Sequence, residues 1–335
     1  MKYQNINIKG TGIYHPTNRL SNEYFIKHFN QLEVEVEGLL THLERNYRYH
    51  SDDPKETVIT MAYNASINAL KNSNINVDEI DIVVFATDTP EYTSPSNAIK
   101  LVHMIEATNA KMVYDTNSNC IGMLSAMDQV SRILKTHKKF KKALVVGSLL
   151  ISSVVSKNDS VTYPNFGDLS AAMILEKEEE DIERGFIDSV YYTKTTEHDN
   201  ILMPKIGYSR TIRDCILDEE DKKWFWDPFD SDFLSDYWMR IIEEVTYDNN
   251  ISPREIDHYV FSQFSNPSSK ETLSKLNVDN SRMVYVGDEY GYTGVTSPIL
   301  ALHKKLESGI IKDGDSCVFC SVGSGSTTVS ILYKF

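Results

Sequence analysis

The sequence is poor in cysteine, has no long apolar run and carries no excess of positive charge. Four cysteines in 335 residues do not form a disulfide framework, so each is considered singly as a thiol of a reducing compartment. The start of the chain has no apolar signal core, and no later run reaches the ~18 apolar residues of a membrane helix. We therefore predict a cytoplasmic protein. The formal net charge of −14 argues against nucleic acid or an anionic membrane as a partner, which leaves small molecules and proteins.

What the sequence does contain is an alternation of apolar β-rich runs with amphipathic stretches, which is typical of an α/β protein with a buried sheet. Strands are predicted at residues 80–87, 110–116, 142–150 and 171–176. Helices are predicted at residues 57–73 and 121–137, where apolar residues recur at helical spacing. In the second helix, one face is formed by Leu124, Met127, Val130 and Leu134.

A charged run, EKEEEDIERG at 176–185, ends in glycine. We place the boundary between two halves of the chain here, at residues 1–178 and 179–335. The simpler interpretation of the run itself is a solvated turn.

The second half of the chain echoes the first. Two pairs of segments are similar: residues 76–96 with 252–269, and residues 112–122 with 283–294. We interpret the echo as a duplicated βαβ unit whose two layers pack back to back. On this alignment Cys120 faces Tyr292. Two strand-to-helix turns then meet near the seam between the halves, where pockets are frequent.

Cys120 lies between a predicted strand and a predicted helix, in the stretch VYDTNSNCIGMLSAM. Backbone amides at a helix N-terminus stabilise an anion, so the pKa of this thiol is predicted to be lowered and the thiol to act as a nucleophile. The polar residues 117–119 suit a helix cap and a sharp turn, and Gly122 lets another segment approach closely. The alternative is a buried small hydrophobe.

The other cysteines have plainer surroundings. Cys317 and Cys320 lie in the apolar run SCVFCSV, with no second cysteine pair or nearby histidine, which favours a core position over a metal or redox site. Cys215 has no recognisable context.

Four segments together resemble the β-ketoacyl carrier-protein synthase III family of the thiolase superfamily, almost end to end. They are GTGIYHPTNRLSN (10–22), the nucleophile segment (87–122), YPNFGDLSAAMILE (163–176) and SVGSGSTTVSILYKF (321–335). The resemblance implies a thiolase-like duplicated α/β fold, in which two βαβ-type halves form a layered α-β-α-β-α core. It also implies a dimer at the seam beside the nucleophile segment. No metal and no bound cofactor is implied, and the substrate is an acyl-CoA or an acyl carrier protein.

By the same resemblance, Cys120 accepts the acyl group as a covalent thioester. The oxyanion is held by the Cys120 amide and by an amide from the run Val322-Gly323-Ser324-Gly325, where the family has a third glycine in place of Ser324. An ordinary tight turn before the last strand is the alternative for this run. Supporting positions are assigned to Asn119, Gly122, Gln263 and Asn266.

The sequence departs from the family at two catalytic positions. Ser262, followed by the expected Gln263, stands where the family has a histidine, and Tyr292 stands where it has an asparagine. Losing one preorganised oxyanion donor typically costs ~100- to 1,000-fold in rate. Decarboxylative condensation is therefore expected to be very weak unless the hydroxyls of Ser262 and Tyr292 substitute.

Other acid–base candidates are His103, His198, His258, Asp288 and Glu289. His258 is expected at the far end of the strand that leads to Ser262, as a surface or packing residue. His103 and His198 remain open as site residues. A solvated turn is favoured for the two acids.

Two segments bear on partners. The basic run KTHKKFKK (135–142) either docks an acidic carrier protein or complements the dipole of a helix C-terminus, and we favour the second. The aromatic run at 224–245 either lines an acyl channel or packs as a helix.

The sequence thus predicts an acyltransferase of the synthase III type that passes an acyl group through Cys120 to an oxygen, nitrogen or sulfur acceptor. The pathway is fatty-acid or specialised-metabolite biosynthesis. One alternative is a decarboxylative condensing synthase that uses Tyr292 and Ser262 as substitute donors. Another is a non-catalytic partner subunit of a heteromeric synthase. The protein is expected to pair with a second copy or with a related synthase.

Overall fold

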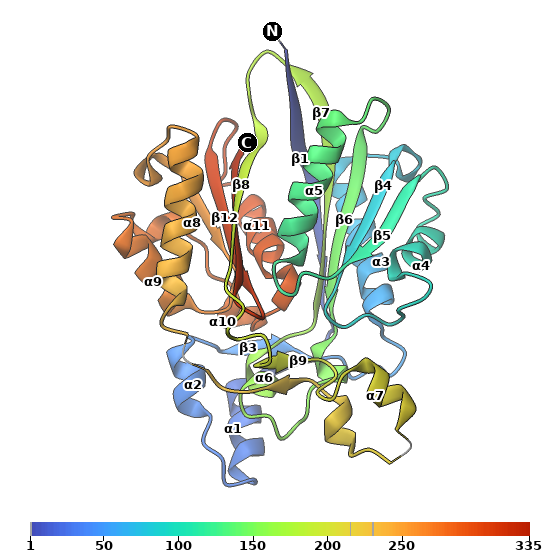
Figure 1. Ribbon diagram of the computed structural model, residues 1–335, viewed down its shortest axis with the longest axis vertical. Coiled ribbons are helices and arrows are strands. Elements are labelled where there is room, and N and C mark those ends of the chain that lie inside the picture. The colour runs from blue at the N-terminus through green and yellow to red at the C-terminus, as the bar shows by residue number, and fades with distance from the viewer. Residues whose placement is uncertain (1, 215, 230) are drawn as a thin grey trace.

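The computed structural model describes residues 2–214, 216–229 and 231–335. Its main feature is a nine-stranded mixed sheet in the order β11-β12-β13-β8-β1-β7-β6-β4-β5 (Figure 1). The bounds are β1 Tyr3–Tyr14, β4 Ile82–Ala86, β5 Met112–Thr116, β6 Lys142–Leu149, β7 Leu169–Glu180, β8 Gly185–Thr193, β11 His258–Phe261, β12 Ser316–Gly323 and β13 Thr327–Lys334. Where β1 meets β8, Ile6 pairs with Gly185 in parallel, and two half-sheets diverge from this point.

Helices sandwich the two half-sheets and give the layered α-β-α-β-α arrangement that the family resemblance implies (Figure 1). The central layer is α5 (Gly122–Thr136) and α11 (Ser297–Glu307), which lie between the half-sheets. The outer layers are α3 (Val58–Ser73) with α4 (Asn97–Met104), and α8 (Leu234–Asp248) with α9 (Asn266–Lys275). Three buried apolar clusters fill the spaces between these layers.

The two half-sheets repeat one topology. In the first, β4 lies between β5 and β6 and is parallel to both. In the second, β11 is parallel to β12 on one side and bridges Met283 in parallel on the other. A capping box precedes each of these central strands, Asn76 with Glu79 and Ser252 with Glu255. The echo between residues 76–96 and 252–269 therefore corresponds to a repeated structural unit.

The strands and helices expected from the sequence are confirmed with shifts of one or two residues at most ends, and of four at the end of β7. The predicted apolar face of α5 is also confirmed, because Leu124, Met127, Val130 and Leu134 are fully buried. The expected polar helix cap is wrong. The N-cap of α5 is Ile121, which makes no side-chain cap, and the Asn117 side chain instead accepts from the Asn119 amide within the preceding turn.

The charged run at 176–185 is only partly a turn. β7 continues to Glu180 because the acids at its end face polar residues of β1, as in the hydrogen bond from Asn5 Nδ2 to Glu180 at 2.7 Å. The division of the chain at 178 and 179 stays a prediction.

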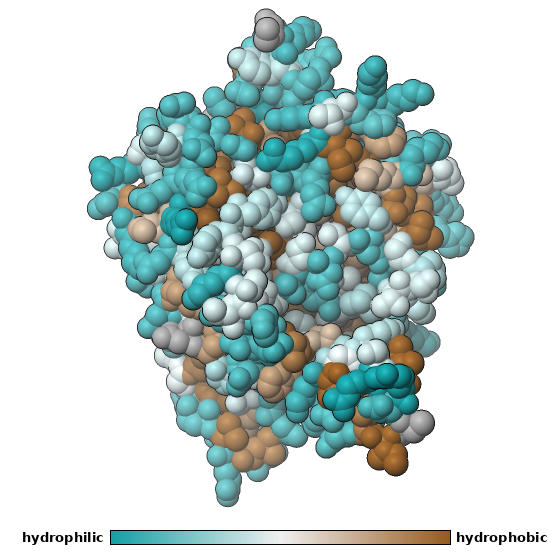
Figure 2. All heavy atoms as spheres, in the orientation of Figure 1, coloured by the Kyte–Doolittle hydropathy of each residue, from teal (hydrophilic) through white to brown (hydrophobic). Residues whose placement is uncertain are grey.

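Smaller elements gather at the end of the molecule where α5 and α11 begin (Figure 1). They are α1 Asn22–Asn30, α2 Glu37–His42, α6 Thr162–Asn165, α7 Tyr208–Arg213, α10 Gly287–Tyr290, β2 Arg19–Ser21, β3 Tyr47–Tyr49, β9 Ile201–Leu202 and β10 Phe225–Trp226. The lobe that carries α7 exposes Ile212 and Ile216, and Figure 2 shows hydrophobic atoms at its tip. Within the described ranges, no helix combines the length and the apolar character needed to cross a membrane.

Candidate active site

Cys120 lies in the turn between β5 and α5 and lines a partly open cavity, whose empty space counted with the adjoining solvent is about 550 Å³. Cys120 is 8% exposed, so the residue is largely buried but still borders this space. The walls of the cavity are mostly aromatic and apolar: Phe166, Ile201, Trp224, Trp226, Phe229, Phe233, Leu234, Phe264 and Val322. A cysteine that lines such a cavity can meet a ligand that enters from solvent.

Tyr292 is held beside Cys120 by its backbone and by its ring. Its amide donates to the Asn165 carbonyl at 2.8 Å, and its carbonyl accepts from the Gly167 amide at 3.0 Å. The ring lies edge-on to Phe166 and Phe264, with centroids 4.8 and 5.4 Å away. The hydroxyl hydrogen-bonds the Cys120 thiol, so the structure brings together the two residues that the internal echo aligned.

Ser262 follows β11 and lies behind Tyr292. It is 1% exposed, and its hydroxyl donates to the Tyr292 hydroxyl at 3.4 Å and lies 3.4 Å from the Ser297 hydroxyl. Ser262 does not line the cavity. It therefore reaches the thiol only through the phenol of Tyr292.

The run Val322-Gly323-Ser324-Gly325 forms the end of β12 and the turn into β13, and it lines the same cavity. A Cβ on Gly323 would stand 3.5 Å from the Cys120 amide nitrogen and 3.1 Å from the Asn119 Cβ, so a side chain there would crowd the Cys120 turn. Asn119 fastens the two segments by donating from Nδ2 to the Ser324 carbonyl at 3.2 Å. Ser324 itself does not have a positive φ, so this position does not require the glycine that the family has.

Asp88, two residues after β4, is a site residue that the sequence analysis missed. The Cys120 thiol donates to its Oδ2 at 3.7 Å. On the internal echo Asp88 aligns with Phe264, which lines the cavity, and that alignment is the signal that could have found it.

The expected low pKa of the Cys120 thiol is wrong for this structure. Burial raises the pKa well above its ordinary value, and the negative charge of Asp88 raises it further, whereas the hydrogen bond with Tyr292 opposes the rise. Burial likewise raises the pKa of Asp88 to about 7 and that of Tyr292 well above its ordinary value. Helix position alone suggested a thiolate, but the loss of hydration outweighs it.

The remaining supporting positions serve the framework. Gly122 packs closely, since a Cβ there would stand 3.0 Å from Val295 Cγ2. The Gln263 side chain donates to the Phe261 carbonyl at 2.9 Å and accepts from the Val286 amide at 2.7 Å, which holds two segments together. Asn266 begins α9 and donates to Glu44 at 2.6 Å, away from the cavity.

None of the other acid–base candidates lies in the cavity. His258 is at the opposite end of β11 from Ser262, as expected, and its Nε2 lies 2.8 Å from Asp315. His103 and His198 are exposed, and neither they nor Asp288 and Glu289 line the cavity. Among the residues that the structure describes, no histidine borders this space.

The remaining cysteines stay outside the site. Cys317 and Cys320 are fully buried in β12, in two different apolar clusters, which confirms the core interpretation. Cys215 lies outside the described residues. The described part of the chain contains no group of three or more His, Cys, Asp or Glu residues placed to hold a metal ion.

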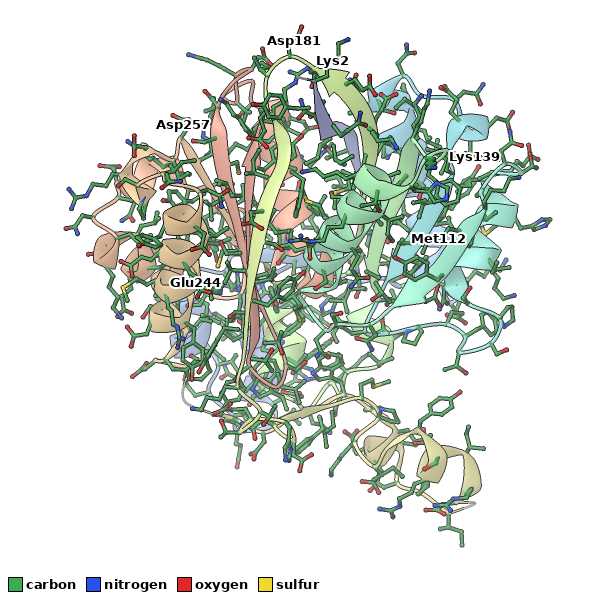
Figure 3. All side chains as sticks on the ribbon, turned by 45° about the horizontal axis from the view of Figure 1, so that its top comes forward. Lys2, Met112, Lys139, Asp181, Glu244 and Asp257 are labelled. Carbon is green, nitrogen blue, oxygen red and sulfur yellow. The ribbon has the colours of Figure 1, made fainter. Side chains whose placement is uncertain are left out.

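Of the two segments considered for partner binding, the aromatic one contributes to the cavity and the basic one lies far from it. The basic run begins in the last turn of α5, whose 15 residues span about 22 Å, so it lies at the far end of that helix from Cys120. Figure 3 shows Lys139 far from the α7 lobe. Lys142 of the run is paired with Glu79 and Glu176. In the aromatic segment, the residues that line the cavity are Trp224, Trp226, Phe229, Ser231, Phe233 and Leu234, whereas Trp238 of α8 packs in the core.

Comparisons with known proteins give one family. The family model described as 3-oxoacyl-(acyl-carrier-protein) synthase III matches residues 114–195, and the model of its C-terminal part matches residues 247–335, together about half of the chain. A β-ketoacyl-(acyl-carrier-protein) synthase III of Rickettsia prowazekii is 27% identical over 328 residues, which cover 98% of this chain and 99% of the relative.

Solved structures agree in fold. The 3-oxoacyl-(acyl-carrier-protein) synthase III of Aquifex aeolicus matches with a TM-score of 0.85 at 22% identity, covering 98% of this chain and all of that one. The priming β-ketosynthase of the R1128 polyketide pathway matches with a TM-score of 0.87 at 19% identity, covering 99% and 96%. With the layered fold and the cysteine at its central turn, these matches show that the chain belongs to the 3-oxoacyl-(acyl-carrier-protein) synthase III family of the thiolase superfamily.

Proposed function

We propose that the protein is an acyltransferase that takes an acyl group from an acyl-CoA or an acyl carrier protein onto Cys120 and passes it to an acceptor. The observation that carries the proposal is the position of Cys120, which lines a largely apolar cavity beside the Gly323 turn. Relatives of similar length are named synthases that act with an acyl carrier protein. An apolar, aromatic wall suits the hydrocarbon part of an acyl group.

In the first half-reaction the Cys120 sulfur attacks the thioester carbonyl carbon. The carbonyl oxygen gains negative charge as the new carbon–sulfur bond forms, and the Cys120 amide with an amide of residues 323–325 would hold that charge. The old carbon–sulfur bond then breaks, and the thiol of coenzyme A or of the carrier leaves with a proton. The acyl group stays on Cys120 as a thioester.

In the second half-reaction we favour transfer to an oxygen, nitrogen or sulfur nucleophile. Decarboxylation of a malonyl group produces an enolate, which needs donors aimed at its oxygen. Ser262 is screened from the cavity by Tyr292, so one of the two substitute donors does not face a bound substrate. A heteroatom acceptor forms no enolate, and its attack on the thioester reuses the same oxyanion donors.

One observation keeps condensation as a second candidate. The Tyr292 hydroxyl contacts the Cys120 thiol, so it is close enough to donate to an enolate formed next to the acylated sulfur. Release of CO2 from a malonyl thioester by the acylated protein would favour this candidate over heteroatom transfer.

The acyl-enzyme is tested by intact mass after incubation with acyl-CoAs of increasing chain length. We expect the gain of one acyl mass, and its loss in Cys120→Ala. Cys317→Ala is the matched control, because that thiol is fully buried in β12 and should leave the adduct unchanged. If no thioester labels the native chain, the acyltransferase proposal is wrong, and the non-catalytic partner subunit becomes the better account.

A further inference from the structure

Asp88 is fixed next to the reactive sulfur by the turn that follows β4. The Thr87 hydroxyl accepts from the Thr89 amide at 3.0 Å, and the Thr89 hydroxyl accepts from the Leu150 amide at 3.3 Å. These bonds tie the turn to the end of β6 and leave the Asp88 side chain directed at Cys120. Its Oδ2 lies 3.7 Å from the sulfur, within hydrogen-bond range for a thiol.

The surroundings of Asp88 differ from those of a structural buried acid. Asp168, the other deeply buried carboxyl near the site, accepts from the Ser51 amide, the Ser152 amide and the Ser152 hydroxyl. Among the described residues, buried Asp88 Oδ1 has no hydrogen-bond partner, and Oδ2 has only the weak donor Cys120. A buried carboxyl that is left unsatisfied costs stability, and such groups are common where an enzyme needs a base.

Asp88 also lines a second cavity, which is distinct from the cavity that Cys120 lines. Counted with the adjoining solvent, the empty space of this cavity is about 880 Å³, and it is lined by the 88–91 turn, by residues that follow β6 and by the α7 segment. Asp88 is 9% exposed. Asp88 therefore contacts the sulfur through Oδ2, and the residue also lines a separate cavity that is partly open to solvent.

We propose that Asp88 is the catalytic base that takes the proton of the Cys120 thiol, in place of a histidine. The inference rests on the proposed acyl transfer. It explains how a buried thiol beside a carboxyl becomes nucleophilic without a nearby cation. The buried carboxyl, with a pKa raised to about 7, is matched to proton transfer near neutral pH.

The step balances without any further reactant. The Asp88 carboxylate takes the thiol proton while the sulfur forms its bond to the thioester carbon. When the old carbon–sulfur bond breaks, the leaving sulfur takes that proton, and Asp88 is a carboxylate again. In the second half-reaction the same carboxylate takes the proton of the acceptor nucleophile, and Cys120 leaves as a thiol that regains it.

The pH dependence of alkylation by iodoacetamide tests the pair, because it needs no thioester. The titratable groups that face Asp88 are Cys120 and Tyr292, with Glu91, Tyr208 and Lys222 on the second cavity. For the native chain we expect alkylation of Cys120, read by peptide mass, to rise near pH 7 and then level off, since the pair then shares one proton. A rise confined to alkaline pH would overturn the proposal.

Asp88→Asn gives the second measurement. With the base removed, alkylation should fall by about 100-fold or more at pH 7 and rise only at alkaline pH, where the buried thiol ionises by itself. If Asp88 only repels the thiolate, the same variant would shift the profile to lower pH, and the proposal would fail. Glu91→Gln, three residues along the same turn, is the matched control and should keep the native profile. Acyl-CoA labelling is scored separately, so a chain with the expected alkylation profile but no acyl adduct would refute the proposed function and not the pair.

Discussion

The Tyr292 side chain sets the chemistry beside the sulfur. Burial raises the pKa of its phenol, so the group stays protonated near neutral pH and serves as a donor. Its ring is wedged between Phe166 and Phe264, and both backbone polar atoms are paired with residues 165 and 167. The hydroxyl position is therefore fixed by contacts that do not depend on the hydroxyl itself. This allows its contribution to be measured without disturbing the fold.

Tyr292→Phe is expected to slow acylation of Cys120 by about tenfold, because a hydrogen bond to a developing charge is typically worth ~1.5–3 kcal/mol and part of it is replaced by solvent. The hydroxyl also lowers the pKa of the thiol, so its removal should move the rise of the rate to higher pH. Single-turnover mass spectrometry across pH measures both. Ser262→Ala should have a smaller effect because that hydroxyl reaches the sulfur only through Tyr292. Equal rates for Tyr292→Phe and the native chain would remove Tyr292 from the mechanism.

Two variants, Gly323→Ala and Ser324→Gly, test the proposed oxyanion donors. The alanine Cβ would stand 3.1 Å from Asn119 Cβ and 3.2 Å from the Ser118 carbonyl oxygen, so the Cys120 turn must shift and the proposed oxyanion donors lose their alignment. We expect acylation to fall ~100- to 1,000-fold, as for loss of one such donor. Ser324→Gly restores the family residue and should change the rate little, since Ser324 has no positive φ. An unaffected Gly323→Ala would place the oxyanion elsewhere.

At this scale the sequence predicted some features well and others badly. Cys120 and Tyr292 could be aligned because each follows a segment that pairs with the central strand of its half-sheet, β5 with β4 and the Met283 bridge with β11. The direction in which the pKa of the thiol shifts could not be predicted from the sequence. It depends on how deeply the turn is buried and on Asp88, which lies 32 residues away in the sequence. The screening of Ser262 by Tyr292 likewise depends on packing that no spacing pattern contains.

At the scale of elements, two turns from the two halves of the chain are locked together under the cavity. Arg45 donates from Nη2 to the carbonyls of Gln263 and Phe264, at 2.7 and 2.9 Å, which fixes the turn after β11. Gly167 packs against the Tyr290 carbonyl in the turn before Tyr292. The strands and long helices follow from periodicity, whereas the small elements at this end of the molecule, such as α2, α10 and β9, are too short to show a period.

Gly167→Ala should therefore destabilise the protein by about 1–3 kcal/mol, the usual cost of overpacking. Its Cβ would stand 2.3 Å from the Tyr290 carbonyl oxygen, which is backbone and cannot rotate away. Equilibrium urea unfolding measures the change. Gly38→Ala is the control, since its Cβ would meet only a glutamate side chain at 3.5 Å within α2, and it should be neutral or stabilising by up to ~1 kcal/mol. Equal destabilisation by both variants would contradict the argument.

At the scale of the whole molecule, the sheet ends in an open strand. β5 is the last strand in the order, all five of its residues are half-buried, and three of them are Met112, Val113 and Tyr114 (Figures 1 and 3). The only acid of β5, Asp115, does not present its charge at the open edge. Its carboxylate accepts hydrogen bonds from the Asn97 and Ala98 amides at the start of α4. An apolar edge strand without a charged guard is a template for pairing with another strand.

We propose that two copies pair through β5, which also places their Cys120 turns near the seam. Sedimentation should then give about twice the 38.2 kDa mass of the chain, and more salt should favour pairing because each copy carries a net charge of −14. Val113→Lys puts a charge on the edge and should yield monomers, whereas Ile310→Lys, at an exposed site after α11, should leave the dimer intact. A native chain that stays monomeric at every concentration and salt would exclude self-pairing. If the monomeric chain then associated with a related synthase through β5, the heteromeric alternative would hold. The edge strand would in that case pair with a strand of the related synthase.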